Sequence, residues 1–121
     1  MKLLTEELKK ILPPIRAQEH AEDPTVYVKF FTPDSNWTWY ATEGEQTEEG
    51  DYLFFGFVIG FEKEWGYFLL SELESARGPM GLGIERAQEA VGPGQGQAFS
   101  SIRGGHVRNW PGSPRSRGPR V

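Results

Sequence analysis

The stretch YLFFGFVI, residues 52–59, limits the fold more than any other part of the chain. Its aromatic and β-branched residues, bounded by glycine-bearing segments, predict a β-strand. Apolar side chains fall on both faces of this strand, and a strand with two apolar faces must be covered from both sides. We therefore expect it to lie inside a sheet, with other parts of the chain packed above and below it.

Three further strands are expected around it. Residues 25–32, TVYVKFFT, alternate so that Val26, Val28 and Phe30 should share one face. The turn sequence PDSN follows, and in the next strand Trp37 and Trp39 should share a face. Residues 65–70 form the fourth predicted strand. Short connections between these strands predict a four-stranded antiparallel meander.

Short helices are expected before and after the sheet. Thr5 is a suitable N-cap for a helix that Pro13-Pro14 ends. Ser71 and Glu74 have the spacing of a capping box for a second helix, which Gly78-Pro79 ends. The predicted fold class is α+β, with helices packed on the sheet.

The composition changes after Arg86. Residues 88–121 contain seven glycines and four prolines, with almost no apolar periodicity. Such a segment buries too little apolar surface to offset its ordering entropy. The sequence thus predicts one domain, residues 1–86, and a disordered tail, residues 87–121, in which Phe99 to Ile102 and Trp110 are the possible points of attachment.

Charge divides the chain at the same place. Residues 1–86 carry 16 acidic and eight basic side chains, whereas residues 87–121 carry five arginines and one glutamate. There is no cysteine, the start MKLLTEELKK is interrupted by charges, and no apolar run has the length of about 18 residues that a membrane helix needs. These features predict a cytoplasmic protein that does not enter a membrane.

Several segments together resemble a family of small bacterial proteins known as domain of unknown function 2958. The similarity covers residues 1 to about 86 and is carried by the segments MKLLTEEL, LPP, DPTVYVKFFTPDSNWTWYATE, DYLFFGFVIG and WGYFLLSELESARGPMGLGIER. Members occur on plasmids, integrating elements and phage-derived islands, so the resemblance implies a role in mobile DNA and implies no catalytic residues. Its charged positions match here at Glu43, Asp51, Glu72 and Glu85-Arg86.

The resemblance ends at Ala87, where the family usually has an aspartate and an aromatic-rich closing segment. The glycine- and arginine-rich tail reads like translation of a GC-rich gene in a shifted frame. Comparing the coding DNA in all three frames tests this hypothesis, and finding no family-like ending in another frame would contradict it.

Two carboxylates are candidate chemical groups. Glu43 and Asp51 flank the acidic insert of residues 44–50, which we interpret as a solvated hairpin tip. Facing each other across the hairpin, the two carboxylates could form an acid/base couple, because paired carboxylates separate their pKa values. The alternative is structural: one acid caps a turn and the other pairs with a base such as Lys29.

The remaining candidates concern binding. Exposed Trp37 or Trp39 beside Lys29 would suit nucleic acid, because single-strand binders stack bases on aromatic rings within a basic groove. The alternative is that these rings fill the core. Glu85 and Arg86 are further candidate binding residues, and their alternative role is to form an ion pair with each other. His20 among acidic neighbours is a weak metal pattern, so no metal and no cofactor are predicted. In the tail, arginine among glycine and serine is typical of nucleic-acid binding; these residues are Arg103, Arg108, Arg115, Arg117 and Arg120.

Three functions follow, in order of preference. The first is a non-catalytic accessory protein of a plasmid or other mobile element that binds a protein partner through its acidic surface, one version being inhibition of a host DNA-acting protein. The second is a nucleic-acid-binding protein that uses the arginine-rich tail and exposed aromatic side chains. The third is a carboxylate-based hydrolase, for which the sequence offers no nucleophile, base and orienting group together.

Overall fold

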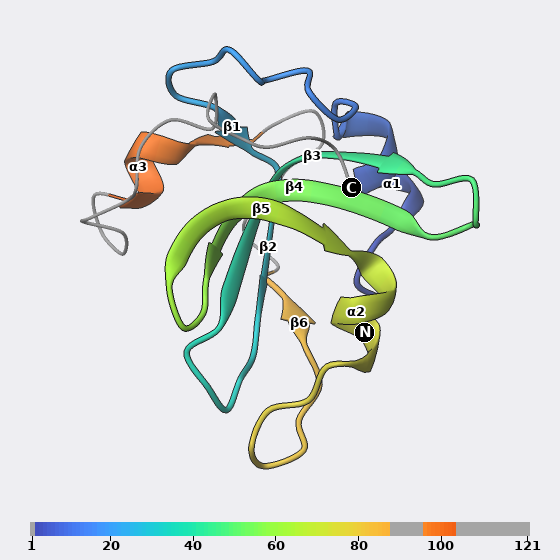
Figure 1. The fold of residues 1–121 in the computed structure, drawn as a ribbon, viewed down its shortest axis with the longest axis vertical. Helices are drawn as coiled ribbons and strands as arrows, with labels where there is room; N and C mark the ends of the chain where they lie inside the picture. Colours follow the sequence, from blue (N-terminus) through green and yellow to red (C-terminus); the bar gives the residue numbers. More distant parts are fainter. Residues whose placement is uncertain (1, 88–95, 104–121) are drawn as a thin grey trace.

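The computed structural model describes residues 2–87 and 96–103 (Figure 1). Its main element is a five-stranded antiparallel sheet in the order β5-β4-β3-β2-β6. The strands are β2 (Val28–Phe31), β3 (Thr38–Gln46), β4 (Tyr52–Ile59), β5 (Lys63–Leu69) and β6 (Glu85–Arg86). The α+β class is therefore confirmed, whereas the predicted number of strands is wrong because β6 adds a fifth strand at the edge.

β6 joins the sheet through two residue pairs. Phe31 lies opposite Glu85, and Phe30 lies opposite Arg86. A strand of two residues after a glycine-rich loop has no alternation of its own, because it takes its conformation from pairing with β2. This explains why periodicity alone did not predict it.

β4 lies inside the sheet between β3 and β5, as its two apolar faces predicted. Phe54, Phe55 and Phe57 are fully buried. At Gly56 a Cβ atom would stand 1.8 Å from the backbone oxygen of Tyr40, so only glycine allows β3 to approach this closely. The central position of the strand is confirmed.

The predicted strand of residues 25–32 is broken into two. β1 (Thr25–Val26) ends before Tyr27, whose backbone N–H donates to the carbonyl of Ala41 at 2.9 Å, and β2 then begins at Val28. The break reverses the alternation. Val26 packs with the cluster around Phe57, whereas Val28 packs in the cluster on the opposite face of the sheet. The expectation that Val26 and Val28 share a face is therefore wrong.

Two helices cover one face of the sheet (Figure 1). α1 (Glu6–Ile11) begins after Thr5, whose hydroxyl accepts the N–H of Leu8 at 3.2 Å. α2 (Leu70–Ser75) begins earlier than predicted, because Glu72 rather than Glu74 folds back, accepting the N–H of Leu69 at 2.8 Å. Leu8 of α1 and Leu73 of α2 join Phe54 in one buried cluster.

The other face is covered partly by the segment expected to be disordered. β7 (Gln97–Ala98) pairs with β1, and α3 (Phe99–Arg103) follows it. Phe99 is fully buried, with its ring 5.1 Å from Phe57 and 5.0 Å from Trp65. Residues 96–103 are thus packed on the sheet through Phe99, one of the expected points of attachment, and the disorder of the tail as a whole stays a prediction. Trp110 lies outside the described residues, and the division at residue 86 stays a prediction.

Candidate functional site

Glu43 owes its position to an irregularity in β3. Ala41 lies opposite Gly56, but Glu43 lies opposite Phe55, so one extra residue, Thr42, is inserted between them. Because side chains alternate along a strand, this β-bulge turns Glu43 to the face opposite Ala41. Thr42 stabilises the bulge by donating its hydroxyl to the carbonyl of Phe55 at 3.2 Å.

The Glu43 carboxylate is fully buried and holds a loop over the sheet. Oε1 accepts the backbone N–H of Arg16 at 2.7 Å, and Oε2 accepts that of Gln18 at 2.8 Å. Glu45, the next residue on this face, accepts the N–H of Ile15 at 3.1 Å. Arg16 has φ 77°, a left-handed conformation that is uncommon outside glycine. These bonds assign Glu43 a role in fixing residues 15–18.

Gln18 completes this network. Its side-chain NH₂ donates to the carbonyls of Thr25 at 2.9 Å and Thr42 at 2.8 Å, and its side-chain oxygen accepts the N–H of Thr25 at 2.7 Å. One amide thus joins the loop, β1 and the bulge. Arg16 and Gln18 were not predicted as site residues, because an irregular polar segment carries no periodic signal.

Asp51 does not face Glu43 as expected. β3 extends to Gln46, which pairs with Tyr52, so the turn is residues 47–51 and part of the presumed hairpin tip is strand. The Asp51 carboxylate accepts the Ser71 hydroxyl at 2.5 Å, and the backbone N–H groups of Ser71 at 3.1 Å and Tyr52 at 2.8 Å. The Ser71 hydroxyl is the main cause that lowers the pKa of Asp51, and desolvation opposes it. Asp51 therefore stabilises the first turn of α2.

Lys29 and the two tryptophans lie on opposite faces of the sheet. The Lys29 ammonium lies 5.8 Å from the ring centre of Tyr40, on the face away from α1 and α2. Trp39 is buried on the helix-covered face, and Trp37 is half-buried beside it. A stacking platform that combines these tryptophans with Lys29 is therefore not formed.

Arg86 closes the edge of the sheet. Its guanidinium donates to the backbone carbonyls of Lys2 at 2.8 Å and Leu3 at 3.2 Å, which ties the N-terminal segment to β6. Glu85 is exposed, and neighbouring strand residues point to opposite faces, so the geometry does not favour an ion pair between them. Arg103 is the last residue of α3, and the other tail arginines lie outside the described residues.

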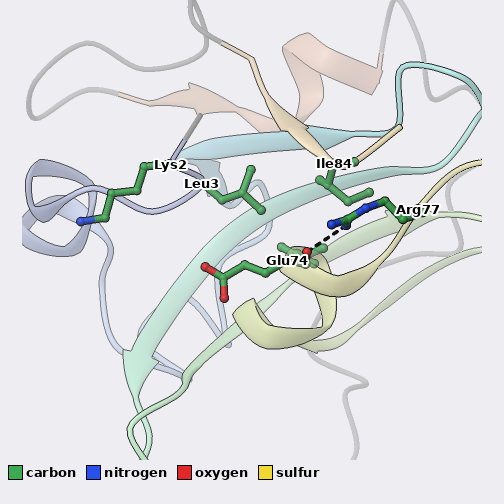
Figure 2. Close-up of a pocket in the computed structure, with 7 residues that line it drawn as sticks. Lys2, Leu3, Glu74, Arg77 and Ile84 are labelled. Atoms are coloured by element: carbon green, nitrogen blue, oxygen red, sulfur yellow. Dashed lines mark hydrogen bonds between the residues drawn. The ribbon is translucent and has the colours of Figure 1, made fainter. Parts of the chain in front are cut away.

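A first hollow, of about 270 Å³, lies between the N-terminal segment and α2 (Figure 2). Leu3 and Ile84 form part of its apolar wall. Figure 2 shows the Lys2 ammonium pointing away from the hollow and the Arg77 guanidinium turned toward the backbone of Glu74. That guanidinium donates to the carbonyls of Glu74 at 3.0 Å and Ala76 at 2.7 Å, so it caps the end of α2.

A second hollow, of about 290 Å³, is also lined by Arg77. Trp37 and Trp39 line it with stacked rings whose centres are 5.7 Å apart. Pro79 lies on its rim. Phe61, almost fully exposed, contacts the same Trp37 ring edge-on at 5.3 Å. The two tryptophans are thus brought together, in an apolar hollow rather than a basic groove.

The exposed charges are strongly unbalanced. Between residues 2 and 87, eleven acidic side chains are exposed against four basic ones. Six of the acids lie on α1, the β3–β4 turn and α2, which lie toward one end of the sheet, on the right in Figure 1. We call this set the acidic end: Glu6, Glu7, Glu48, Glu49, Glu72 and Glu74.

The described ranges hold neither a membrane-spanning helix nor a cluster of metal ligands. No helix in residues 2–87 or 96–103 is both long and apolar enough to span a membrane. In the same residues no group of three or more histidine, cysteine or acidic side chains is placed to hold a metal ion. His20 is exposed and lies 3.9 Å from Glu19.

Comparison with known proteins identifies a family. The model of the family described as "Protein of unknown function (DUF2958)" matches residues 3–92, about three quarters of the chain. No curated protein and no solved structure matches the chain. The match includes β1 to β6 and both helices on the covered face, so it rests on the folded part described above. The chain belongs to the DUF2958 family.

Proposed function

We propose that this protein is a non-catalytic, cytoplasmic accessory protein of a bacterial mobile element, which binds a basic surface of a partner protein through its acidic end. The concentration of exposed acids at one end of the sheet is the observation that supports this proposal. The partner is one whose basic surface otherwise receives DNA, so binding inhibits a host DNA-acting protein.

The hydrogen bonds of the two candidate carboxylates favour a binding protein over a hydrolase. Glu43 accepts two backbone N–H groups from the loop that covers it, and Asp51 accepts a hydroxyl and an N–H from α2. A general base needs a nucleophile within hydrogen-bond reach, in a space that substrate can enter. Glu43 is fully buried, so substrate cannot reach it, and Asp51 binds both the hydroxyl and the backbone N–H of Ser71 as a cap of α2.

Electrostatics explains how an acidic end can compete with DNA. Duplex DNA carries one negative charge per roughly 1.7 Å of axis, and the proteins that bind it offer clustered lysine and arginine side chains. A dense set of exposed carboxylates is attracted to the same surface and speeds the encounter, with an effect that weakens as salt rises. The exposed bases Lys2 and Lys10 belong to the N-terminal segment and α1, whereas Glu48 and Glu49 stand on the β3–β4 turn.

The test uses paired charge variants of the full chain. Glu48→Gln/Glu49→Gln removes two charges from the acidic end, and Glu64→Gln/Glu85→Gln removes two exposed charges elsewhere. Proteins captured from the bacterial host would be challenged with duplex DNA. We expect DNA to displace the wild type from its partner, the first variant to bind at least about tenfold more weakly, and the control to bind normally. Equal binding by both variants, or a partner that DNA does not displace, would contradict the proposal.

The nucleic-acid alternative is tested in the same experiment series. Labelled single- and double-stranded DNA is titrated with the wild type and with a tail variant in which Arg108, Arg115, Arg117 and Arg120 are glutamine. Direct, salt-sensitive binding that the tail variant loses would favour the alternative function, because phosphate contacts through arginine weaken steeply with salt. Our proposal expects no such binding.

A further inference from the structure

Phe61 is an exposed apolar side chain in a tight turn between β4 and β5. It is 95% exposed and lies in a three-residue turn, because Ile59 at the end of β4 pairs with Lys63 at the start of β5. The N–H of Gly60 donates to the carbonyl of Glu62 across this turn at 2.9 Å. A single exposed apolar side chain is common on protein surfaces, but this one contacts the Trp37 ring that lines an apolar hollow, and contiguous exposed apolar surface commonly marks an interaction site.

The neighbouring tryptophan hollow has the size for one side chain. Its volume of about 290 Å³ lies just below the range of about 300–1,000 Å³ typical of pockets for drug-sized ligands. Its lining is mainly apolar, with the stacked rings of Trp37 and Trp39 on one side and Pro79 on the rim. Aromatic rings pack well edge-on or offset against other rings, so a phenyl group suits this lining.

The exposed side chain and the hollow are neighbours that share one residue. The Trp37 ring contacts Phe61 and also lines the hollow. At Gly60 a Cβ would stand 2.3 Å from the Trp37 ring, so the glycine allows this ring to pack against the turn that carries Phe61. A protrusion and a hollow on one region are what a two-fold interface needs, because each copy must offer both.

We propose that the hollow receives Phe61 of a second copy of this chain, forming a two-fold symmetric dimer. The charges beside the two features are complementary: Glu62 follows Phe61, and Arg77 borders the hollow. Both side chains are exposed. Insertion of Phe61 therefore brings Glu62 toward Arg77 of the partner subunit, twice per dimer. This dimer does not depend on the function proposed above.

The test is the mass of the full-length protein in solution as a function of concentration. Sedimentation velocity should show the wild type approaching twice the 13.7 kDa chain mass as concentration rises. Phe61→Ser should weaken dimerisation by about thirtyfold or more, the effect of losing a central hot spot. Because Phe61 is exposed, this variant should unfold at the same temperature as the wild type when both are monomeric.

Charge exchange tests the geometry more specifically. Glu62→Lys should weaken the dimer, and combining it with Arg77→Glu should restore affinity toward that of the wild type. Glu64→Lys makes the same charge change at an exposed position away from Phe61 and should have little effect. Circular dichroism checks α2 in the Arg77 variant, because Arg77 also caps that helix. A wild type that stays monomeric, a dimer that survives Phe61→Ser, or a double variant no better than Glu62→Lys overturns the proposal.

Discussion

Replacing Glu43 with glutamine should strongly destabilise the fold, although the side chain keeps its size. The carboxylate accepts N–H bonds at 2.7 and 2.8 Å from two backbone positions of the covering loop. A glutamine oxygen can still accept one of these bonds, but its NH₂ group then faces the other N–H donor. Hydrogen bonds to charged groups contribute about 1.5–3 kcal/mol each, and a buried unsatisfied donor costs about 1–3 kcal/mol. We therefore expect Glu43→Gln to lower the free energy of unfolding by about 2–4 kcal/mol.

Urea unfolding followed by tryptophan fluorescence measures this change, and Glu45→Gln is the matched control. Glu45 lies on the same face of β3 and accepts one loop N–H at 3.1 Å, but it is only half-buried. Its glutamine oxygen can keep that bond, while the NH₂ group can reach water, so the control should lose less than about 1 kcal/mol. Trypsin should also cut after Arg16 faster in Glu43→Gln, because the bond that holds the backbone there is weakened.

A free energy of unfolding for Glu43→Gln within about 0.5 kcal/mol of the wild type would refute this reasoning, since surface substitutions have effects of that size. The same conclusion would follow if both glutamine variants were destabilised equally. In either case the loop would be held by its apolar contacts, chiefly those of Ile15 with Leu53 and Phe55, rather than by the buried carboxylate.

Three further predictions concern other parts of the fold. Asp51→Asn should destabilise the protein at pH 7, and its difference from the wild type in unfolding free energy should shrink as pH falls below about 4. The reason is that the pKa of Asp51 is lower in the folded than in the unfolded state, so its stabilisation is present above the unfolded pKa and is lost as pH falls through the folded pKa; urea midpoints at several pH values test this. Gly78→Ala should lower the free energy of unfolding by about 1–3 kcal/mol, because its Cβ would stand 1.6 Å from a carboxylate oxygen of Asp34 in the β2–β3 turn. Gly66→Ala, whose Cβ would have nothing within 4 Å, should lower it little, and thermal unfolding compares the two variants. Phe99→Ala should lower the free energy of unfolding by about 3–5 kcal/mol, whereas Ser101→Ala, at an exposed position of α3, should change it very little. Equal effects of the two variants would show that α3 does not pack as described.

Periodicity predicted the strands of the main sheet because each buries a face against other elements. Residues 52–59 were placed correctly in the interior, and Trp37 and Trp39 were placed correctly on one face. The errors occur where the chain breaks alternation. The interruption at Tyr27 and the extra residue Thr42 are each stabilised by a hydrogen bond to a residue distant in sequence, which no local pattern contains.

The candidate site was predicted less well for the same reason. The sequence drew attention to Glu43 and Asp51, but their partners are a loop 25 or more residues earlier and a helix 20 residues later. The bulge moves Glu43 to the other face, and β3 continues beyond the expected hairpin tip, so the two groups are separated. Acids alike in the sequence thus differ in place and role, because Glu43 is buried and holds a loop whereas Glu48 and Glu49 are exposed on a turn.

The sheet topology relates the two proposed surfaces. In an antiparallel meander successive turns lie at opposite ends, so the β4–β5 turn with Phe61 lies away from the β3–β4 turn with Glu48 and Glu49 (Figure 1). A dimer formed through Phe61 therefore leaves the β3–β4 turn of each copy exposed. Two linked copies bind a surface with repeated sites more tightly than one, without any new contact. Phe61→Ser should then weaken binding to a densely immobilised partner while leaving binding to a dilute, monovalent partner unchanged, whereas Glu48→Gln/Glu49→Gln should weaken both.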